Sequence, residues 1–336
     1  MAQWAHYSTP DPEWLAHKPV LWSDPNATPE SENEGSETKL LRLQRRVAET
    51  LKQHVKEASA PVGITVEEQR IRMSRHPGEI AVRVYTPKLD DAEETFPVII
   101  QLHGGGFCLG TLDNDELKCR ALCATHRTVV VNVDYRLAPA FPWPVGLNDS
   151  YDAVKWVVRD APDLRVSIDK GLIVSGESAG ANFTCVIAQR ARDDPELKGK
   201  ITGQVLQIPS TCSGRLQGYP EKYKDQLLSF EQNKDDPIIT RSMMKMFVDA
   251  YKPAPAGNPE VSPLLAESFV GLPPAYVQVA GADALRDEGL LYTQLMQESG
   301  VQTKLDVYPG VPHGFATSLP QLAEPEAVTP NVNGEL

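Results

Sequence analysis

The chain has 336 residues, 41% of them hydrophobic, so it can bury a large core without disulfides or metal sites. Its formal net charge is -12, which argues against nucleic acid or an anionic membrane surface as a partner. The first residues show no basic segment followed by an apolar one, and no apolar run reaches the roughly 18 residues of a membrane span. We therefore expect a cytoplasmic protein with no membrane span.

The first part of the chain predicts an arm that packs on the rest of the protein. Residues 1–37 have no clear period but contain Trp4, Tyr7, Trp14 and Trp22, too many large aromatic side chains for a purely disordered tail. Apolar residues then recur at helical spacing over residues 40–55, which predicts an amphipathic helix.

A doubly wound α/β sheet is predicted for the remainder. The segments 64–73 and 80–87 are typical of two paired antiparallel strands. From residue 96 onward, six apolar, β-branched runs predict strands buried on both faces of a parallel sheet. Helical stretches separate most of them. The strand runs are 97–103, 128–135, 171–178, 203–210, 275–281 and 303–310, and the helices are 115–126, 147–159, 179–192 and 286–299. Residues 213–262 depart from this rhythm and are interpreted as an insertion over the sheet.

Five cysteines are present, an odd number, which favours free thiols in a reducing compartment. Cys119, Cys123 and His126 fall on one face of the helix predicted at 115–126. A metal site there would lack a fourth ligand, so we interpret them as packing residues. Neither a metal nor a cofactor is expected.

The stretch HGGGF at residues 103–107 places three consecutive glycines after a predicted strand. A dinucleotide-binding loop requires a glycine where Leu109 stands, and a phosphate-binding loop requires a lysine where Thr111 stands, so both nucleotide motifs are excluded. Two interpretations remain: a tight turn, or a loop whose backbone N–H groups approach a reacting atom without obstruction.

The motif G-x-S-x-G occurs as Gly176-Glu177-Ser178-Ala179-Gly180, directly after a predicted strand and before a helix. In this context the motif predicts a strained strand-to-helix turn that exposes the serine hydroxyl as a nucleophile. Such a serine needs a base and an acid that orients the base, in the chain order serine, acid, histidine.

His313 is the only histidine after Ser178, so it is the candidate base. Asp283 follows a predicted strand through a turn of small residues, and we assign it as the acid. Asp287 and Glu288 are the alternatives, but they open the next helix, where acidic side chains satisfy free N–H groups.

The glycine loop can then supply the oxyanion hole, because serine attack on a carbonyl leaves a negative oxygen that needs N–H donors. The candidate donors are the N–H groups of Gly105, Gly106 and Ala179. His103, which precedes the nucleophile in the chain, is expected to brace this loop. Gly104 and Glu177 complete the two motifs.

Five motifs in this order resemble the hormone-sensitive-lipase-like branch of the α/β-hydrolases, also called bacterial family IV or the α/β-hydrolase-3 type. They are HGGGF, DYRLAPAFPWP, GESAGAN, the stretch from Val261 to Gly289, and HGF at 313–315, and the resemblance covers roughly residues 60–318. It implies an α/β-hydrolase fold, a mostly parallel twisted sheet with helices on both faces, and the same assignments of Ser178, Asp283, His313 and the three donors.

The resemblance also implies a helical cap. The expected division is an arm and helix at 1–58 that belong to the cap, a catalytic domain at 59–212 and 263–320, and a cap insertion at 213–262. Relatives end in an amphipathic helix after HGF. The segment 321–336 instead contains two prolines and little periodicity, so its structure and any dimer contact near it are left open.

The expected function is a cofactor-free serine carboxylic-ester hydrolase acting on soluble short- to medium-chain or natural-product esters, as a monomer or homodimer. One alternative is acyl transfer, elimination or cyclisation with the same triad. A second is a non-catalytic receptor, as in relatives that have lost a triad member, but here all three members are present.

Overall fold

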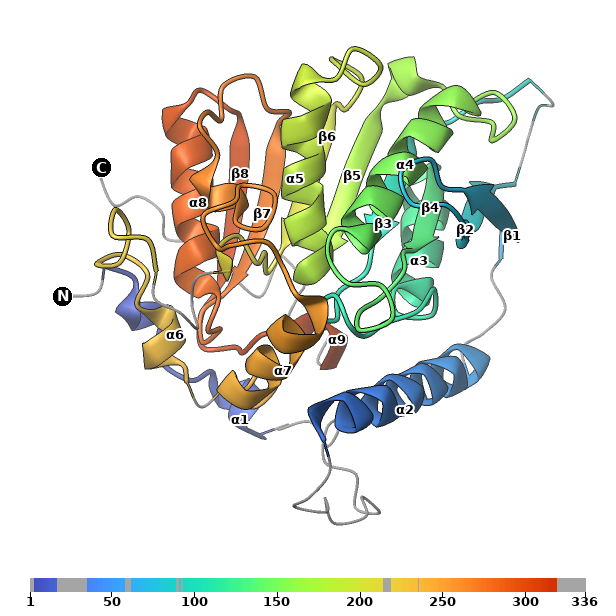
Figure 1. Cartoon of the computed structure of the whole chain (residues 1–336). Helices are drawn as coiled ribbons and strands as arrows, with labels where there is room; N and C mark the ends of the chain where they lie inside the picture. Colours follow the sequence, from blue (N-terminus) through green and yellow to red (C-terminus); the bar gives the residue numbers. More distant parts are fainter. Residues whose placement is uncertain are drawn as a thin grey trace.

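The computed structural model describes residues 3–16, 35–57, 62–88, 91, 93–213, 219–234 and 236–318. An eight-stranded sheet forms the centre of the molecule (Figure 1). Its strands are β1 (Ile64–Arg72), β2 (Glu79–Pro87), β3 (Val98–Leu102), β4 (Val129–Asp134), β5 (Leu172–Glu177), β6 (Gly203–Gln207), β7 (Ala275–Ala280) and β8 (Thr303–Tyr308).

The strand order is β1-β2-β4-β3-β5-β6-β7-β8. β2 pairs antiparallel with β1 and with β4, and all other neighbours pair parallel. The predicted mostly parallel sheet with an antiparallel pair at its start is therefore confirmed. Because the parallel strands all end at one edge, the loops that follow them meet there.

Helices connect the strands and cover both faces of the sheet. The longer ones are α2 (Ser36–Glu57), α3 (Glu116–His126), α4 (Val145–Arg159), α5 (Ala179–Asp193), α7 (Arg241–Tyr251) and α8 (Arg286–Glu298). The short ones are η1 (Ala5–Ser8), α1 (Pro12–Ala16), η3 (Ile168–Lys170), α6 (Ser229–Gln232), η5 (Pro263–Leu265) and α9 (Phe315–Ser318). No helix in the described ranges is long and apolar enough to cross a membrane.

Successive side chains of a strand point to opposite faces of the sheet, so apolar side chains form a core on each face. Ile100 of β3 packs in the large cluster that includes residues of α4 and α5, whereas its neighbour Ile99 packs against Cys119 and Cys123 of α3. Both cysteines are free and fully buried, and burial raises the pKa of the Cys123 thiol to about 12. The interpretation as packing residues is therefore confirmed for the two cysteines, whereas it is wrong for His126, which is exposed at the end of α3.

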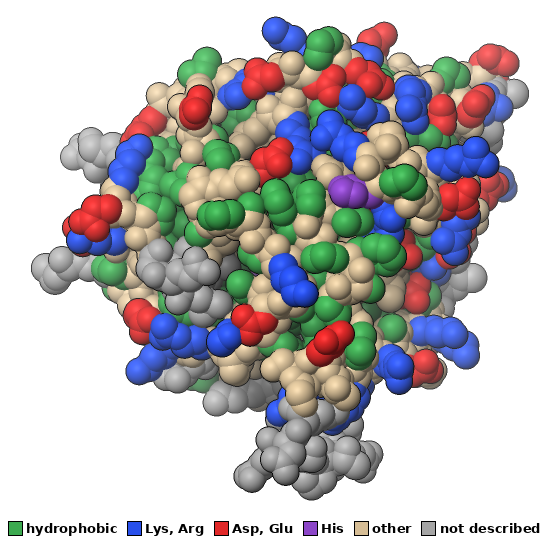
Figure 2. All heavy atoms as spheres, in the orientation of Figure 1, with side chains coloured by type: hydrophobic (Ala, Val, Ile, Leu, Met, Phe, Trp, Pro, Cys, Tyr) green, Lys and Arg blue, Asp and Glu red, His purple; other side chains and the backbone are tan. Residues whose placement is uncertain are grey.

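Charged side chains are dispersed over the face of the molecule that Figure 2 shows. On the face shown in Figure 2, acidic and basic side chains are interspersed with apolar ones. This face therefore shows no region of a single charge sign that would attract a polyanion.

Helices α1, α2, α6 and α7 lie together beyond one edge of the sheet (Figure 1). α2 comes from the N-terminal part of the chain and contacts α7, which belongs to the insertion between β6 and β7. Gln44 anchors α2 to the body of the protein, because its Nε2 group donates hydrogen bonds to the carbonyl oxygens of Cys108 at 2.6 Å and Ala138 at 2.9 Å.

The N-terminal arm packs on the turn that follows β8. Gly310 donates its N–H to the carbonyl of Tyr7 at 2.8 Å and accepts from the N–H of Asp11 at 3.0 Å. The side chain of Trp14 is buried against Tyr308 and its neighbours. The aromatic content of the arm thus predicted its packing correctly for these residues, while Trp22 and the segment 321–336 lie outside the described residues.

The expected role of Asp287 and Glu288 as caps of their own helix is wrong. Both are buried in the first turn of α8, but they accept hydrogen bonds from two other segments. Asp287 accepts from the N–H groups of Leu228 at 2.8 Å and Ser229 at 2.7 Å. Glu288 accepts from the N–H of Thr211 at 2.8 Å, so these carboxylates hold the insertion to α8.

Asp287 also neutralises a buried cation. The Nε of Arg286 donates to Asp287 at 2.8 Å, and both side chains are almost completely buried. We therefore predict that Asp287→Ala lowers the free energy of unfolding by about 3–5 kcal/mol, because it leaves a buried guanidinium without its counter-charge. Urea denaturation measures this change.

The matched control is Asp249→Ala, which breaks the exposed pair that Asp249 forms with Lys245 at 2.6 Å. Exposed pairs contribute little, so its cost is expected below about 1 kcal/mol. Equal costs for the two variants would show that Asp287 does not anchor the insertion.

Candidate active site

Ser178 occupies a strained turn between β5 and α5. Its backbone has φ 52° and ψ −109°, a conformation that residues with a side chain rarely adopt. The turn is possible because its neighbours are glycines: a Cβ on Gly176 would lie 2.3 Å from Gly180, and one on Gly180 would lie 2.1 Å from the carbonyl oxygen of Leu102. The turn projects the serine hydroxyl beyond the end of the sheet.

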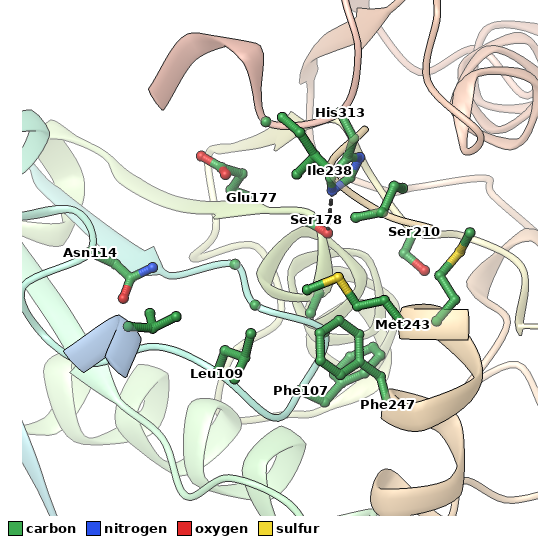
Figure 3. A pocket seen from close by; sticks show the side chains of 18 of the residues that line it. Phe107, Leu109, Asn114, Glu177, Ser178, Ser210, Ile238, Met243, Phe247 and His313 are labelled. Carbon is green, nitrogen blue, oxygen red and sulfur yellow. Dashed lines mark hydrogen bonds between the residues drawn. The ribbon is translucent and has the colours of Figure 1, made fainter. Parts of the chain in front are cut away.

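The structure brings Ser178, His313 and Asp283 into one hydrogen-bonded chain. His313, in the loop after β8, places Nε2 2.9 Å from the Oγ of Ser178, and Figure 3 shows this bond. Its Nδ1 lies 2.8 Å from the carboxylate of Asp283, in the loop after β7. Three loops that follow parallel strands thus meet at one edge, in the arrangement that the chain order predicted.

Asp283 satisfies the orienting role better than the two neighbouring acids. Its carboxylate is buried and faces His313, and its other oxygen accepts the N–H of Leu285 at 2.8 Å. Asp287 and Glu288 are occupied elsewhere by the backbone of the insertion. The geometry therefore leaves Asp283 as the acid in contact with the imidazole.

Two opposing effects act on the pKa of His313. Burial lowers it, but the negative charge and hydrogen bond of Asp283 raise it, and the net result is a pKa above the ordinary value of 6.5. Asp236, in the insertion, contributes in the same direction and accepts the backbone N–H of His313 at 3.3 Å. Nothing in the sequence of the insertion indicated that Asp236 would contact His313.

The residues that carry the candidate oxyanion donors line the same cavity as Ser178. Gly105 and Gly106 have φ values of 119° and 60°, which favour glycine. Space requires glycine as well, since a Cβ on Gly106 would lie 2.3 Å from the ring of Phe247, in the cap helix α7. Among the described residues, the N–H groups of Gly105, Gly106 and Ala179 make no hydrogen bond outside their own helix or strand, so they are available to a substrate oxygen.

His103 determines how the peptide between Gly104 and Gly105 is oriented. Its Nδ1 lies 2.7 Å from the carbonyl oxygen of Gly104, and its ring stacks on Tyr135 with the centroids 4.2 Å apart. Burial lowers the pKa of His103, which favours the neutral ring with its proton on Nδ1, donated to this carbonyl. In a trans peptide the C=O and the next N–H point in opposite directions, so this bond directs the N–H of Gly105 away from His103.

Glu177 points to the other side of β5 from Ser178. Burial, followed by the charge of Asp115, raises the pKa of its carboxyl, which favours the neutral acid. Glu177 lies close to Gly104, since a Cβ on that glycine would be 3.4 Å from Oε1. It thus borders the oxyanion loop without contacting the hydroxyl of Ser178.

A cavity of about 250 Å³ lies beside these groups, between the glycine loop and helices α2 and α7. Phe107, Met243 and Phe247 form one wall beside Ser178, while Leu109 and Asn114 lie at the opposite side (Figure 3). The remaining lining residues are Arg46, Val47, Thr50, Leu51, Gly104, Gly105, Gly106, Glu177, Ala179, Ser210, Ile238, Ile239, Met244, Val248, Leu285, His313 and Gly314. In the sequence, the lining residues of α2 were indicated only by the apolar periodicity at 40–55, and those of α7 only by a stripe of Met and Phe residues at 243–248.

No group of three or more His, Cys, Asp or Glu side chains within the described ranges is arranged to hold a metal ion. The chemistry available from these residues is nucleophilic attack by a serine, proton transfer by a histidine and stabilisation of an oxyanion by backbone N–H groups.

Comparison with known proteins gives concordant results. A family model described as alpha/beta hydrolase fold matches residues 99–317. The chain is 37% identical over 238 residues to a versiconal hemiacetal acetate esterase of Dothistroma septosporum, covering 70% of this chain and 71% of that protein. It is 36% identical over 265 residues to carboxylesterase NlhH of Mycobacterium tuberculosis, covering 73% and 75%. A crystal structure of vibralactone cyclase superposes with a TM-score of 0.83 at 31% identity, covering 94% of this chain and 91% of that one.

The raised pKa of His313 predicts the pH dependence of turnover. Only the neutral imidazole can accept the serine proton, so kcat/KM for an ester should rise with pH and reach half its maximum above pH 6.5. Asp283→Asn removes the largest of the contributions that raise this pKa and allows the wrong tautomer, so kcat should fall by about 10³–10⁴-fold and the half-point should move to lower pH. A pH–rate profile measures both effects.

Asp287→Asn is the control for this experiment. It should lower the stability of the fold but leave the pH dependence of kcat/KM unchanged. Near-normal turnover by Asp283→Asn together with loss of turnover in Asp287→Asn or Glu288→Gln would mean that the acid is misassigned.

The brace formed by His103 yields a separate prediction. His103→Phe keeps an aromatic ring against Tyr135 but loses the bond to the carbonyl of Gly104, so the N–H of Gly105 is less well directed. We expect kcat to fall by about 10- to 100-fold with little change in KM, because the loss affects the transition state more than the bound substrate.

Steady-state kinetics on one ester measures the split between kcat and KM. Tyr135→Phe, which removes only the bond from the tyrosine hydroxyl to the carbonyl of His103 at 2.7 Å, is the matched control and should lose far less. An equal loss of kcat in both variants would mean that His103 acts only through packing and does not orient the N–H of Gly105.

Proposed function

The chain belongs to the hormone-sensitive-lipase-like branch of the α/β-hydrolase family and is a carboxylesterase-type hydrolase, and we propose that it works through Ser178, His313 and Asp283. The observation that supports this proposal most strongly is the continuous hydrogen-bonded chain from Ser178 Oγ through His313 to the buried Asp283. Such a chain converts a weak hydroxyl into a nucleophile.

The first half of the reaction acylates the serine. Ser178 Oγ attacks the carbonyl carbon of the ester while its proton passes to Nε2 of His313, and Asp283 stabilises the imidazolium that forms. The carbonyl oxygen becomes negative and is held by the N–H groups of Gly105, Gly106 and Ala179, each worth about 2.7–4 kcal/mol in the transition state. Collapse of this intermediate releases the alcohol, which takes the proton from His313.

The second half releases the acid. Water enters where the alcohol has left, gives a proton to His313 and attacks the acyl carbon. The same N–H groups hold the oxyanion, and the proton returns to Ser178 Oγ when the acid leaves. No cofactor takes part in either half.

We propose that the substrates are soluble short- to medium-chain or natural-product esters. The cavity is small and largely apolar, and its outer walls come from α2 and α7, which leaves no broad apolar face for a lipid surface among the described residues. The Dothistroma relative is, by its name, an esterase of an acetate ester, which fits a small acyl group next to Ser178.

Cyclisation is a second candidate, favoured by the similarity to vibralactone cyclase over 94% of this chain. In such a reaction a hydroxyl of the acyl group gives its proton to Nε2 of His313 and attacks the acyl carbon. Ser178 Oγ then leaves with this proton, and no water is consumed. Heavy-isotope oxygen from labelled water enters the acid product of hydrolysis and is absent from a lactone, so mass spectrometry separates the two reactions.

A cytoplasmic location and a monomeric or homodimeric state also remain proposals. The location is supported by the five cysteines, which are all free in the structure.

A panel of esters tests the proposed function. The wild-type chain should hydrolyse soluble acetyl to octanoyl esters faster than emulsified long-chain triglycerides, and Ser178→Ala should abolish turnover. A fluorophosphonate probe should label the wild-type chain at Ser178 and leave the variant unlabelled, since Ser178 is the serine with a base in contact.

Ser210→Ala is the matched control, because Ser210 also lines the cavity but is not a member of the hydrogen-bonded chain from Ser178 Oγ through His313 to Asp283. Labelling at a serine other than Ser178 with activity retained would overturn the nucleophile assignment, and faster turnover of the emulsified substrate would overturn the substrate class.

A further inference from the structure

The two sides of the cavity differ in chemistry. On the side of α7, the wall is apolar and consists of Met243, Met244 and Phe247 together with Phe107. On the opposite side Asn114 lies near Leu109 (Figure 3), and α2 contributes Arg46 and Thr50 to the lining. α2 also contributes the apolar Val47 and Leu51, so a substrate meets a mixture of polar and apolar side chains there and apolar side chains along α7.

Asn114 presents a donor toward this space. Its Oδ1 accepts the N–H of Thr111 at 2.9 Å, which assigns the amide orientation and leaves Nδ2 on the other side of the amide group. Figure 3 shows that this nitrogen points toward the middle of the cavity. Within the described residues, Nδ2 has no hydrogen-bond partner, so it is available to an acceptor.

Arg46 is the only lysine or arginine among the described residues that line the cavity. It is exposed and forms no salt bridge or side-chain hydrogen bond with a described residue. The two acidic residues that flank Asn114 in the chain are engaged elsewhere: Asp113 pairs with Arg83 at 2.9 Å, and Asp115 accepts from Gln101 at 2.9 Å. A guanidinium that no described side chain pairs with, at an apolar cavity, can attract a negative group of the ligand.

Because the chain as a whole carries a net charge of -12, its overall field would repel an anionic substrate. Attraction of such a substrate therefore depends on a local positive group at the cavity, and Arg46 is that group. Among the described residues that line the cavity, Glu177 is the one with a carboxyl group. Its side chain points away from Ser178 (Figure 3), and burial raises its pKa, which favours the neutral form.

We propose that Arg46 and the Nδ2 group of Asn114 form a subsite for a carboxylate or similar anionic group, so that the preferred esters carry a negative charge at one end. This inference rests on the proposed ester hydrolysis. It names a substrate class, namely monoesters of dicarboxylic acids or esters of carboxyl-bearing alcohols, with the apolar part of the molecule against α7.

Binding to Ser178→Ala, which cannot turn the ester over, tests the subsite by calorimetry with two matched pairs of esters. The first pair is the para-nitrophenyl monoester of adipic acid and para-nitrophenyl hexanoate, and the second is the acetate of para-hydroxymethylbenzoate and benzyl acetate. Adding Arg46→Gln should weaken binding of the anionic member of at least one pair by about 3- to 10-fold and leave its neutral partner unchanged. The effect should shrink at high salt.

Two further variants sharpen the result. Arg45→Gln changes a neighbouring exposed cation on α2 that does not line the cavity, so it should leave both members of each pair unchanged. Asn114→Asp keeps an acceptor for the N–H of Thr111 but replaces the donor with a carboxylate, so it should weaken the anionic member specifically.

Unchanged binding of both anionic esters in Arg46→Gln, or an equal loss for the neutral esters, would overturn the subsite. If the variants behave as expected but the wild-type chain turns over no ester, the anion subsite stands and the proposed hydrolysis fails. Turnover of neutral and anionic esters with no dependence on Arg46 would support the hydrolysis and overturn the subsite.

Discussion

The backbone at Ser178 is the constraint on which the rest of the site depends. A residue with a side chain is held at φ 52° because strand β5 must stop and helix α5 must begin within one residue. The strain is tolerated because Gly176 and Gly180 let the turn close and let α5 approach β3 at the carbonyl of Leu102. As a result the hydroxyl stands beyond the sheet edge, and the N–H of Ala179 at the start of the helix faces the same space.

The second set of constraints fixes loops that come from distant parts of the chain. Buried carboxylates do much of this work: Asp236 holds the backbone of His313, Asp283 holds its ring, and Asp287 and Glu288 hold the insertion to α8. A buried carboxylate that accepts backbone N–H groups is stable where an unpaired one would not be. The histidine loop and the cap are therefore tied to the same framework that carries Ser178.

Sequence reasoning succeeded where the chemistry is local. The turn at Ser178, the glycine loop and the alternation of strands and helices depend on neighbouring residues, and each was predicted with boundaries close to the observed ones. The reasoning was wrong about Asp287 and Glu288, because their position at the start of a helix also satisfies the pattern of a helix cap. Their true partners, Leu228 and Thr211, lie 59 and 77 residues away in the chain.

The sequence by itself determined the fold class, and it indicated Ser178, His313 and the glycine loop as the candidate nucleophile, base and oxyanion donors, because each is encoded by a short motif or by a forced choice such as the single histidine after Ser178. Asp283 was already preferred over Asp287 and Glu288 from the sequence, but only the tertiary structure showed that it contacts that histidine. Only the structure decided how His103 orients the peptide of Gly105 and which residues of α2 and α7 line the cavity. These depend on the packing of α2 and α7 over the sheet edge. The physical reason is that side-chain contacts between segments far apart in the chain leave no periodic or spacing signal in either segment.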